Sequence, residues 1–324
     1  PSAAKVPQTA IYAASVAALS ALSYYYMSRI SNPFKPYLIM RIMAAYARND
    51  DDEGSISAYH GVHHLPLVKI ATLVEGVRGK VCSVKTFTFR LPDSKIVLDK
   101  YIDLSHGDVV KTHSIGAFGE PAGHKNYSPT DVSTPGHINI TVKIYSDGVN
   151  SQLFDKLRIG DTVGMSGPWP PKRMRNLRLP GECVNIVCFG VGITEAIEIV
   201  RGELKRGDAK RIILLYANRY REDAFFRKEL SEIQARTQSS STDCIFRLAY
   251  LYSREDKNSM VDGELKGRVD TDLLKDVFDL PSSSGQIGKH REQRFLIVGS
   301  RKMIEDTWKL LEPLEYNREN HSLL

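Results

Sequence analysis

Three short stretches contain groups that could bind an anionic cofactor. Lys125, Tyr127 and Ser128 bring a positive charge, an aromatic ring and a hydroxyl together within four residues. The stretch 189–195 (FGVGITE) joins an apolar run to a helical pattern, and a helix N-terminus attracts phosphate. In the stretch 298–303 (VGSRKM), two basic residues could attract a phosphate or be exposed surface charge. These features point to a phosphate-bearing ligand.

Other reactive side chains are not spaced for a metal site or a catalytic triad. His60, His63 and His64 lie close together, but no cysteine or acidic residue accompanies them at ligand spacing. That pattern favours a polar loop, and we expect no metal. The four cysteines form no CxxC pair, so we expect reduced thiols. No Walker-type loop or Ser-His-Asp arrangement is evident.

Length and composition favour two folded domains. A chain of 324 residues can bury two cores, and its 42% apolar and 25% charged residues are typical of globular proteins. Forty-four basic and 38 acidic side chains give a net charge of +6. The two signs are interleaved and form no basic face, so we expect no nucleic-acid partner.

The amino terminus predicts a membrane anchor. Residues 9–28 carry no charge and are long enough to cross a bilayer as one helix. Three tyrosines, 24–26, lie at one end, where aromatic rings prefer the membrane interface. Basic residues are more frequent after this segment, which predicts that the folded domains lie on the cytosolic or matrix side. A buried hairpin helix or a cleaved signal are the alternatives.

A second short helix is expected at about residues 36–48. Its centre, 37–46 (YLIMRIMAAY), has a single charge and could lie in the membrane interface or pack on a neighbouring membrane protein. The acidic run 49–54 reads as a solvated linker. We therefore assign residues 1–55 to the anchor, with membrane lipid as a partner.

Residues 56–180 predict a small antiparallel barrel. Polar and apolar residues alternate in 81–91, 108–115 and 137–145, which is the period of half-buried strands. Glycine and proline clusters separate these runs. One helix is expected at 151–157.

Residues 181–324 predict a parallel sheet covered by helices. Strands and helices alternate in this half, and ligands of such sheets lie beyond the carboxyl ends of the strands. We expect strands at 184–189, 211–217, 244–252 and 295–298. Helices are expected after 193 and at 224–235, 270–278 and 302–314.

Taken in order, these motifs resemble the ferredoxin–NADP reductase superfamily, and most closely the NADH–cytochrome b5 reductases. The stretch 125–128 (KNYS) resembles the Arg-x-Tyr-Ser/Thr segment that holds FAD in this family. The stretches 142–145 (VKIY) and 148–151 (GVNS) resemble the next strand and the turn that cradles the pyrophosphate. The resemblance implies an FR-type FAD-binding barrel followed by a Rossmann-like domain for NADH or NADPH.

The family's cofactor contacts fall on fourteen positions of this chain. The resemblance implies catalytic roles for Ser128, near the reactive flavin nitrogen, and for Thr194, on the nucleotide side. It implies that Tyr127 packs on the flavin and that Lys143 steers the nicotinamide. The full set is Lys125, Tyr127, Ser128, Val142, Lys143, Tyr145, Gly148, Asn150, Ser151, Gly190, Gly192, Thr194, Gly299 and Met303.

The chain departs from the family pattern at five places. Lys125 replaces an arginine and cannot fork across two phosphate oxygens. Phe189 adds a ring where the family has none, and Glu195 puts a carboxylate where a phosphate would meet the helix N-terminus. Val298 replaces the cysteine that lies against the nicotinamide. The chain ends in Leu324, where the family has an aromatic residue over the flavin.

The choice between NADH and NADPH stays open on the sequence. Asn218 follows the second parallel strand, where the adenosine ribose is expected. Its neutral side chain does not exclude a 2′-phosphate, and Arg219 or Arg221 could bind one.

Two functions remain. In the first, the protein is a membrane-anchored flavoprotein of electron transport that oxidises NAD(P)H and reduces a haem protein at the same membrane. In the second, it is a degenerate reductase that serves as an accessory subunit of a membrane complex, because the departures fall on the nucleotide site while packing positions survive. A mitochondrial membrane is favoured, and the endoplasmic reticulum is the alternative.

Overall fold

The computed structural model describes residues 62–77, 81–100, 102, 104, 107–115, 121–169, 182–239, 244–280 and 292–323. The predicted membrane helix, the second short helix and the acidic linker all lie outside these ranges. Within the ranges, no helix combines the length and the apolar character needed to cross a membrane.

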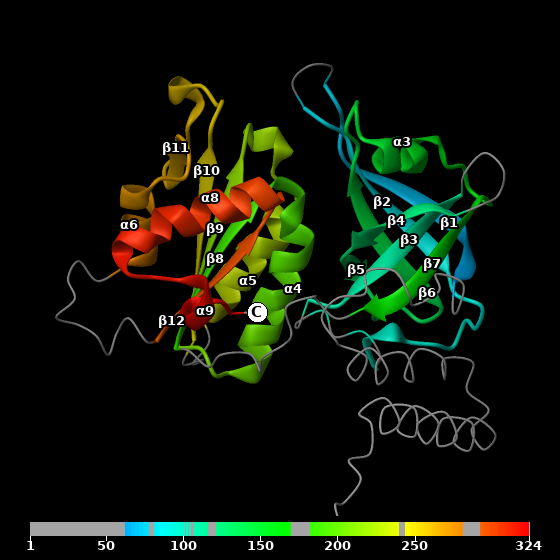
Figure 1. Cartoon of the computed structure of the whole chain (residues 1–324), viewed down its shortest axis with the longest axis horizontal. Coiled ribbons are helices and arrows are strands. Elements are labelled where there is room, and N and C mark those ends of the chain that lie inside the picture. The colour runs from blue at the N-terminus through cyan, green and yellow to red at the C-terminus, as the bar shows by residue number, and fades with distance from the viewer. Residues whose placement is uncertain are drawn as a thin grey trace, which may run out of the picture. The chain divides into compact units, whose positions relative to one another are not determined.

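Seven antiparallel strands form the first sheet, in the order β4-β3-β7-β1-β2-β6-β5 (Figure 1). Their bounds are β1 (His63–Val74), β2 (Val84–Arg90), β3 (Val109–Ile115), β4 (Pro121–Tyr127), β5 (Pro129–Asp131), β6 (His137–Lys143) and β7 (Thr162–Trp169). The predicted antiparallel sheet is thereby confirmed. In the described part of the chain, no pairing of β4 with β5 closes this sheet into a complete ring.

Alternating apolar residues hold this sheet to its helix. Phe87 and Phe89 of β2 are fully buried, as their spacing predicts. Both rings lie edge-on to Phe154 of α3 (Val149–Lys156), at 5.1 and 6.5 Å between centroids. A short 3-10 helix, η1 (Leu98–Lys100), follows β2.

The prediction of a polar loop around His63 and His64 was wrong. Both residues begin the twelve-residue strand β1, where they pair with Met165 and Gly164 of β7. The alternation that marks a strand starts only at Leu65 and Leu67, both buried, so the histidines concealed its beginning.

Five parallel strands form the second sheet, in the order β11-β10-β9-β8-β12. The strands are β8 (Cys183–Phe189), β9 (Arg211–Asn218), β10 (Ile245–Tyr252), β11 (Glu264–Lys266) and β12 (Gln293–Val298). The helices are α4 (Ile193–Arg206), α5 (Arg227–Ser239), α6 (Thr271–Phe278), α8 (Arg301–Leu311) and α9 (Arg318–His321). Four 3-10 helices complete it: η3 (Gly190–Gly192), η4 (Arg221–Asp223), η5 (Lys257–Ser259) and η7 (Glu312–Leu314). Four of the strands were expected from the sequence, whereas β11 was not.

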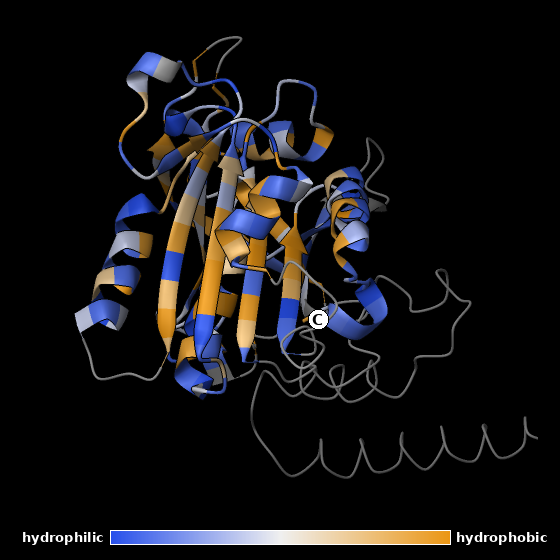
Figure 2. Ribbon diagram, turned by 90° about the vertical axis from the view of Figure 1, so that its left-hand side faces the viewer, coloured by the Kyte–Doolittle hydropathy of each residue, from blue (hydrophilic) through white to orange (hydrophobic). Residues whose placement is uncertain are grey.

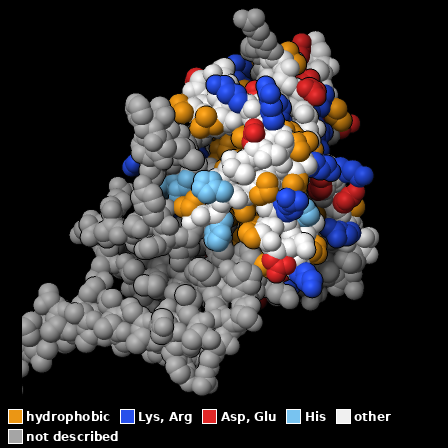
Figure 3. All heavy atoms as spheres, turned by 90° about the vertical axis from the view of Figure 1, so that its right-hand side faces the viewer, with side chains coloured by type: hydrophobic (Ala, Val, Ile, Leu, Met, Phe, Trp, Pro, Cys, Tyr) orange, Lys and Arg blue, Asp and Glu red, His pale blue; other side chains and the backbone are white. Residues whose placement is uncertain are grey.

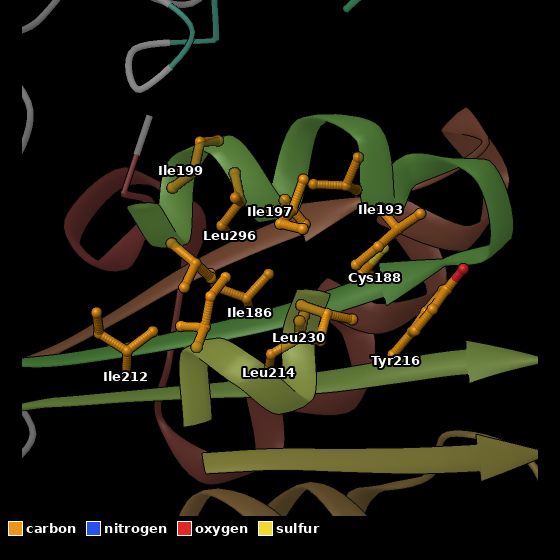
Figure 4. Packing of buried hydrophobic residues seen from close by; sticks show 14 of the residues in the cluster. Ile186, Cys188, Ile193, Ile197, Ile199, Ile212, Leu214, Tyr216, Leu230 and Leu296 are labelled. Carbon is orange, nitrogen blue, oxygen red and sulfur yellow. The ribbon is translucent and has the colours of Figure 1, made fainter. Parts of the chain in front are cut away.

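Apolar strands lie at the centre of this second unit, with helices on both faces (Figure 2). One core joins the sheet to α4 and α5, and Figure 4 shows Ile193 and Ile197 of α4 pointing toward the strands. A second core joins the other face to α6 and α8 through Phe278, Phe295 and Trp308. Burying each such side chain stabilises the folded state by about 1.5–3 kcal/mol. This packing holds the ends of the strands in place, and the glycine turns begin there.

Candidate functional site

One cavity of about 1170 Å³ collects all fourteen positions named from the sequence. The antiparallel sheet contributes the ends of β4 and β6 and the start of α3. The parallel sheet contributes the turns that follow β8, β9, β10, β11 and β12. Residues as far apart in the chain as Lys125 and Met303 therefore line the same cavity. Which of them contact a cofactor stays a prediction.

The end of β4 supplies a charge, a ring and a hydroxyl. Lys125 is exposed, and within the described ranges no carboxylate pairs with its ammonium. The ring of Tyr127 lies 5.3 Å from that of Phe154, which holds it in place. Burial raises the pKa of the Tyr127 phenol to about 12, so its hydroxyl stays protonated and can donate. Ser128 follows at the edge of the cavity.

The turn before α3 has the form of an anion cradle. Gly148 caps this helix without any side-chain hydrogen bond, so the first N–H groups of the helix are left for a ligand. A Cβ on Gly148 would collide with Oγ of Ser151 and approach Cβ of Tyr145 to 3.1 Å. The Ser151 hydroxyl accepts a hydrogen bond from the Tyr145 backbone N–H at 3.1 Å. These residues fit a cofactor pyrophosphate.

A lysine-to-arginine change at position 125 tests this side of the site. Lys125→Arg should tighten FAD binding about tenfold, because a guanidinium can donate two parallel hydrogen bonds to phosphate oxygens. The measurement is a titration of the cofactor-free protein with FAD by flavin fluorescence. Lys156→Arg, at an exposed position of α3 outside the cavity, is the matched control. Equal tightening in both variants would argue against a phosphate contact by residue 125.

The turn after β8 is packed against the turn after β12. A Cβ on Gly192 would lie 2.8 Å from Cγ1 of Val298, so this close approach requires glycine. A Cβ on Gly299 would likewise lie 2.9 Å from Cδ2 of Phe189. The Phe189 ring therefore occupies space beside Gly299 at the mouth of the nucleotide turn. The Thr194 hydroxyl donates to the Val191 carbonyl at 3.0 Å, which closes the first turn of α4.

Lys143 does not extend freely into the cavity. Its ammonium forms a 2.7 Å ion pair with Oδ1 of Asp223, and the two side chains are 6% and 0% exposed. The second oxygen of Asp223 lies 3.5 Å from Nε of Arg219. A buried carboxylate therefore neutralises this ammonium, and the role of Lys143 in steering the nicotinamide stays a prediction. Asp223 thus connects residues of the two domains. The sequence analysis did not identify it, because no local pattern distinguishes it from an exposed acidic residue.

A row of histidines lies on the antiparallel sheet, outside the cavity. Figure 3 shows histidine side chains gathered on one face of the molecule. Strand pairing sets His124 opposite His113, and His113 and His64 both opposite Gly164. Burial, with smaller contributions from the positive charges of His124, Lys111 and His64, lowers the pKa of His113. Among the described residues, no group of three or more His, Cys, Asp or Glu is placed to hold a metal ion.

The ends of β10 and β11 add residues that are not among the fourteen predicted cofactor contacts. Arg254 and Arg268 line the cavity, as does Ser253. Arg254 could have been identified from the sequence, because it lies just after a predicted parallel strand, where ligands of such sheets bind. Arg268 lies in the stretch 267–270 (GRVD), which also follows the family pattern and for which a structural role is expected.

Comparison with known proteins matches each of the two domains to a family. Residues 78–170 match the model of the oxidoreductase FAD-binding domain, and residues 186–309 match that of the oxidoreductase NAD-binding domain. NADH-cytochrome b5 reductase 2-A of Vanderwaltozyma polyspora is 25% identical over 270 residues, which cover 82% of this chain and 77% of that protein. NADH-cytochrome b5 reductase 2 of Aspergillus oryzae is 25% identical over 63% of this chain and 59% of its own length.

Solved structures agree on the fold. The cytochrome b5 reductase domain of Ulva prolifera nitrate reductase superposes with a TM-score of 0.61 at 20% identity, covering 81% of this chain and 96% of that one. An FAD-binding antiparallel domain followed by an NAD-binding parallel sheet defines a two-domain flavin-dependent oxidoreductase. The chain belongs to the ferredoxin–NADP reductase superfamily as a cytochrome b5 reductase-like member, and its domains are those for FAD and NAD(P)H.

Proposed function

We propose that this protein is a membrane-anchored flavoprotein that takes hydride from NAD(P)H onto FAD and passes electrons to a haem protein. The observation that carries the proposal is the single cavity, in which the β4 and α3 groups face the glycine turns after β8 and β12. FAD, when bound, supplies the exchange between a hydride donor and a one-electron acceptor. The protein's own task is to hold the two cofactors against each other.

Each part of the cavity has a defined task in this function. Lys125 offers its unpaired ammonium to the pyrophosphate, together with the free N–H groups at the start of α3. Tyr127 gives the flavin an apolar wall held by Phe154. Ser128 and Thr194 both line the cavity, one from each domain. The buried Lys143–Asp223 pair ties β6 to η4 and so limits relative movement of those sides.

The anchor and the acceptor are parts of the proposal that rest on the sequence and on the names of the relatives. An uncharged amino-terminal segment would hold the reductase on the same surface as its acceptor, which raises their effective concentration. The relatives are named for cytochrome b5, a haem protein, and we propose an acceptor of that kind. We favour a mitochondrial membrane over the endoplasmic reticulum.

A reconstituted assay tests the acceptor. The full-length protein in lipid vesicles, supplied with NADH or NADPH, should reduce membrane-bound cytochrome b5, followed by the haem absorbance. A chain that begins at residue 56 should reduce a water-soluble dye equally well but the vesicle-bound haem protein more slowly. Dye reduction without any haem reduction would show that the acceptor is wrong.

The second candidate is an accessory subunit that has lost the reaction. It is favoured by the packing of Phe189 against Gly299 and by Val298 beside Gly192, which replace two positions that the family uses around nicotinamide. The Lys143–Asp223 pair adds to this reading, since it neutralises the lysine at the end of β6. Copurification in a stable membrane complex, with flavin that NAD(P)H does not reduce, would support this candidate over the first.

A further inference from the structure

The strand that carries the predicted flavin contacts is an edge strand. β4 lies at one end of the sheet order, and within the described residues it pairs with β3 alone. Lys125 and Tyr127 belong to β4, and Ser128 directly follows it. An edge strand has no second neighbour to hold it in place. The position of these residues in the cavity therefore depends on the pairing of β4 with β3.

Two histidines lie opposite each other across that pairing. His113 of β3 pairs with His124 of β4, and the centroids of their rings are 6.1 Å apart. Residues that are directly opposite in antiparallel strands lie on the same face of the sheet, and successive residues of a strand alternate between faces. Lys125 and Tyr127 therefore lie on the face away from the histidines. The histidine pair joins the two strands immediately before the flavin segment begins.

The ring of His113 is held in this position from the other side. Its Nε2 lies 2.7 Å from Oγ of Ser166 in β7, a residue that is 5% exposed. Gly164 of the same strand leaves room for imidazoles on both sides, since a Cβ there would lie 3.5 Å from Cβ of His113 and 3.6 Å from Cε1 of His64. The hydrogen bond to Ser166 limits how far His113 can turn away from His124.

In the described part of the chain, the charged groups that act on His113 are all basic. They are His124 of β4, His64 of β1 and Lys111 of β3 itself, whereas β7 brings the uncharged hydroxyl of Ser166. Burial first, and these groups second, lower the pKa of His113 below its ordinary value of about 6.5. The folded state therefore takes up this proton less readily than the unfolded chain does. Stability is present above the ordinary pKa and is lost as the pH falls through the lower pKa of the folded state.

We propose that His113 and His124 form an acid-sensitive latch on β4, so that acidification loosens this strand and weakens the binding of FAD. The latch rests on the proposed flavin function and adds a mode of regulation to it. Imidazoles take up protons as the pH falls below neutrality, and like charges directly opposite each other destabilise a strand pair. Because β4 is held on one side, the loss falls on the segment that contains Lys125 and Tyr127.

The ratio of FAD affinities at two pH values tests the latch. The full-length, detergent-solubilised protein, freed of its cofactor, is titrated with FAD by flavin fluorescence at about pH 7.5 and about pH 5, with folding verified by circular dichroism. We expect the dissociation constant of the wild type to rise about fivefold at the lower pH.

Three variants separate the latch from a general effect of acid. His124→Gln removes one of the two opposed charges and should hold the change below about twofold. His124→Glu should reverse its direction, because a carboxylate attracts the protonated His113. The matched control is His137→Gln in β6 of the same sheet, where residue 137 pairs with Arg90, and it should keep the wild-type ratio.

Hydrogen–deuterium exchange of the cofactor-free protein tests the strand without FAD. After correction for the pH dependence of chemical exchange, residues 121–128 should open more often at the lower pH in the wild type and not in His124→Gln. Equal FAD affinity at the two pH values, the same ratio in His124→Gln as in the wild type, or unchanged opening of β4 would overturn the latch.

The outcome is separable from the reductase proposal. A flavin that NAD(P)H reduces at neutral pH, in a protein whose FAD affinity does not depend on pH, would reject the latch and keep the reductase. A protein that takes up no FAD at either pH, but whose β4 opens on acidification only while His124 is present, would reject the flavin function and uphold the latch on this strand.

Discussion

Replacing Asp223 with asparagine is expected to lower the free energy of unfolding by about 3–5 kcal/mol, because it leaves a buried ammonium without its counter-charge. The Asp223 side chain is fully buried and Lys143 is 6% exposed, so the ammonium has little contact with solvent to offset the loss of the 2.7 Å contact. The pair also connects β6 with η4, so the loss should reach both sheets. Urea unfolding followed by circular dichroism, with midpoints compared between variants, measures the effect.

A double variant separates the ion pair from simple loss of packing. Lys143→Met with Asp223→Leu removes both charges and keeps apolar volume, and such replacements are often neutral or stabilising. We expect it to recover most of the lost stability, since Arg219 is 39% exposed and can be solvated without Asp223. If the double variant is as unstable as Asp223→Asn, the cost arises from packing and not from an unpaired charge.

Restoring the family residues at three positions should increase the rate at which NAD(P)H reduces the bound flavin by about 10²-fold, since a misplacement of about 1 Å can cost that much. The triple variant carries Phe189→Gly, Glu195→Pro and Val298→Cys. The first frees the space beside Gly299, and the second removes a carboxylate from the first turn of α4, where proline is tolerated. Stopped-flow absorbance of the flavin measures the rate.

Two controls accompany this variant. Removing the partly buried Phe189 ring should cost about 2–3 kcal/mol, so folding must be verified at the assay temperature. A second triple variant with Val298→Ala in place of Val298→Cys removes similar volume without adding sulfur. A folded Val298→Cys triple variant whose reduction rate equals that of the wild type would mean that these positions do not limit the reaction.

The sequence predicted the strands of both sheets where the apolar periodicity was clear. Phe87 and Phe89 alternate with polar neighbours, and Val184 to Phe189 form a run that is apolar except at Asn185, so β2 and β8 were placed within a few residues. The helix expected at 302–314 ends as α8 and the 3-10 helix η7 because Pro313 interrupts it. The sequence analysis did not predict strands β1, β4, β5, β7 and β11. Histidines begin β1, and β11 has only three residues.

For the site, too, features that depend on local sequence could be predicted, whereas contacts between distant residues could not. The motif positions could be placed on one cavity because each adjoins a strand end, and strand ends of one sheet meet at one edge. The pairing of Lys143 with Asp223, 80 residues later, depends on how the two sheets meet, which no local pattern encodes. The ion pair between Arg221 and Glu264 likewise depends on a tertiary contact. The sequence therefore named residues that line one cavity. The structure shows which of the charged side chains near that cavity are already paired with other side chains.

The most direct test of the central claim is a visible absorbance spectrum of the purified, detergent-solubilised protein, recorded before and after anaerobic addition of NADH or NADPH. We predict flavin bands that bleach on addition of NADH or NADPH. Flavin bands that neither dinucleotide bleaches would contradict the reductase function while leaving an FAD-binding protein. A spectrum without flavin bands, from protein that also fails to take up added FAD, would contradict the assignment of this cavity to a flavin cofactor.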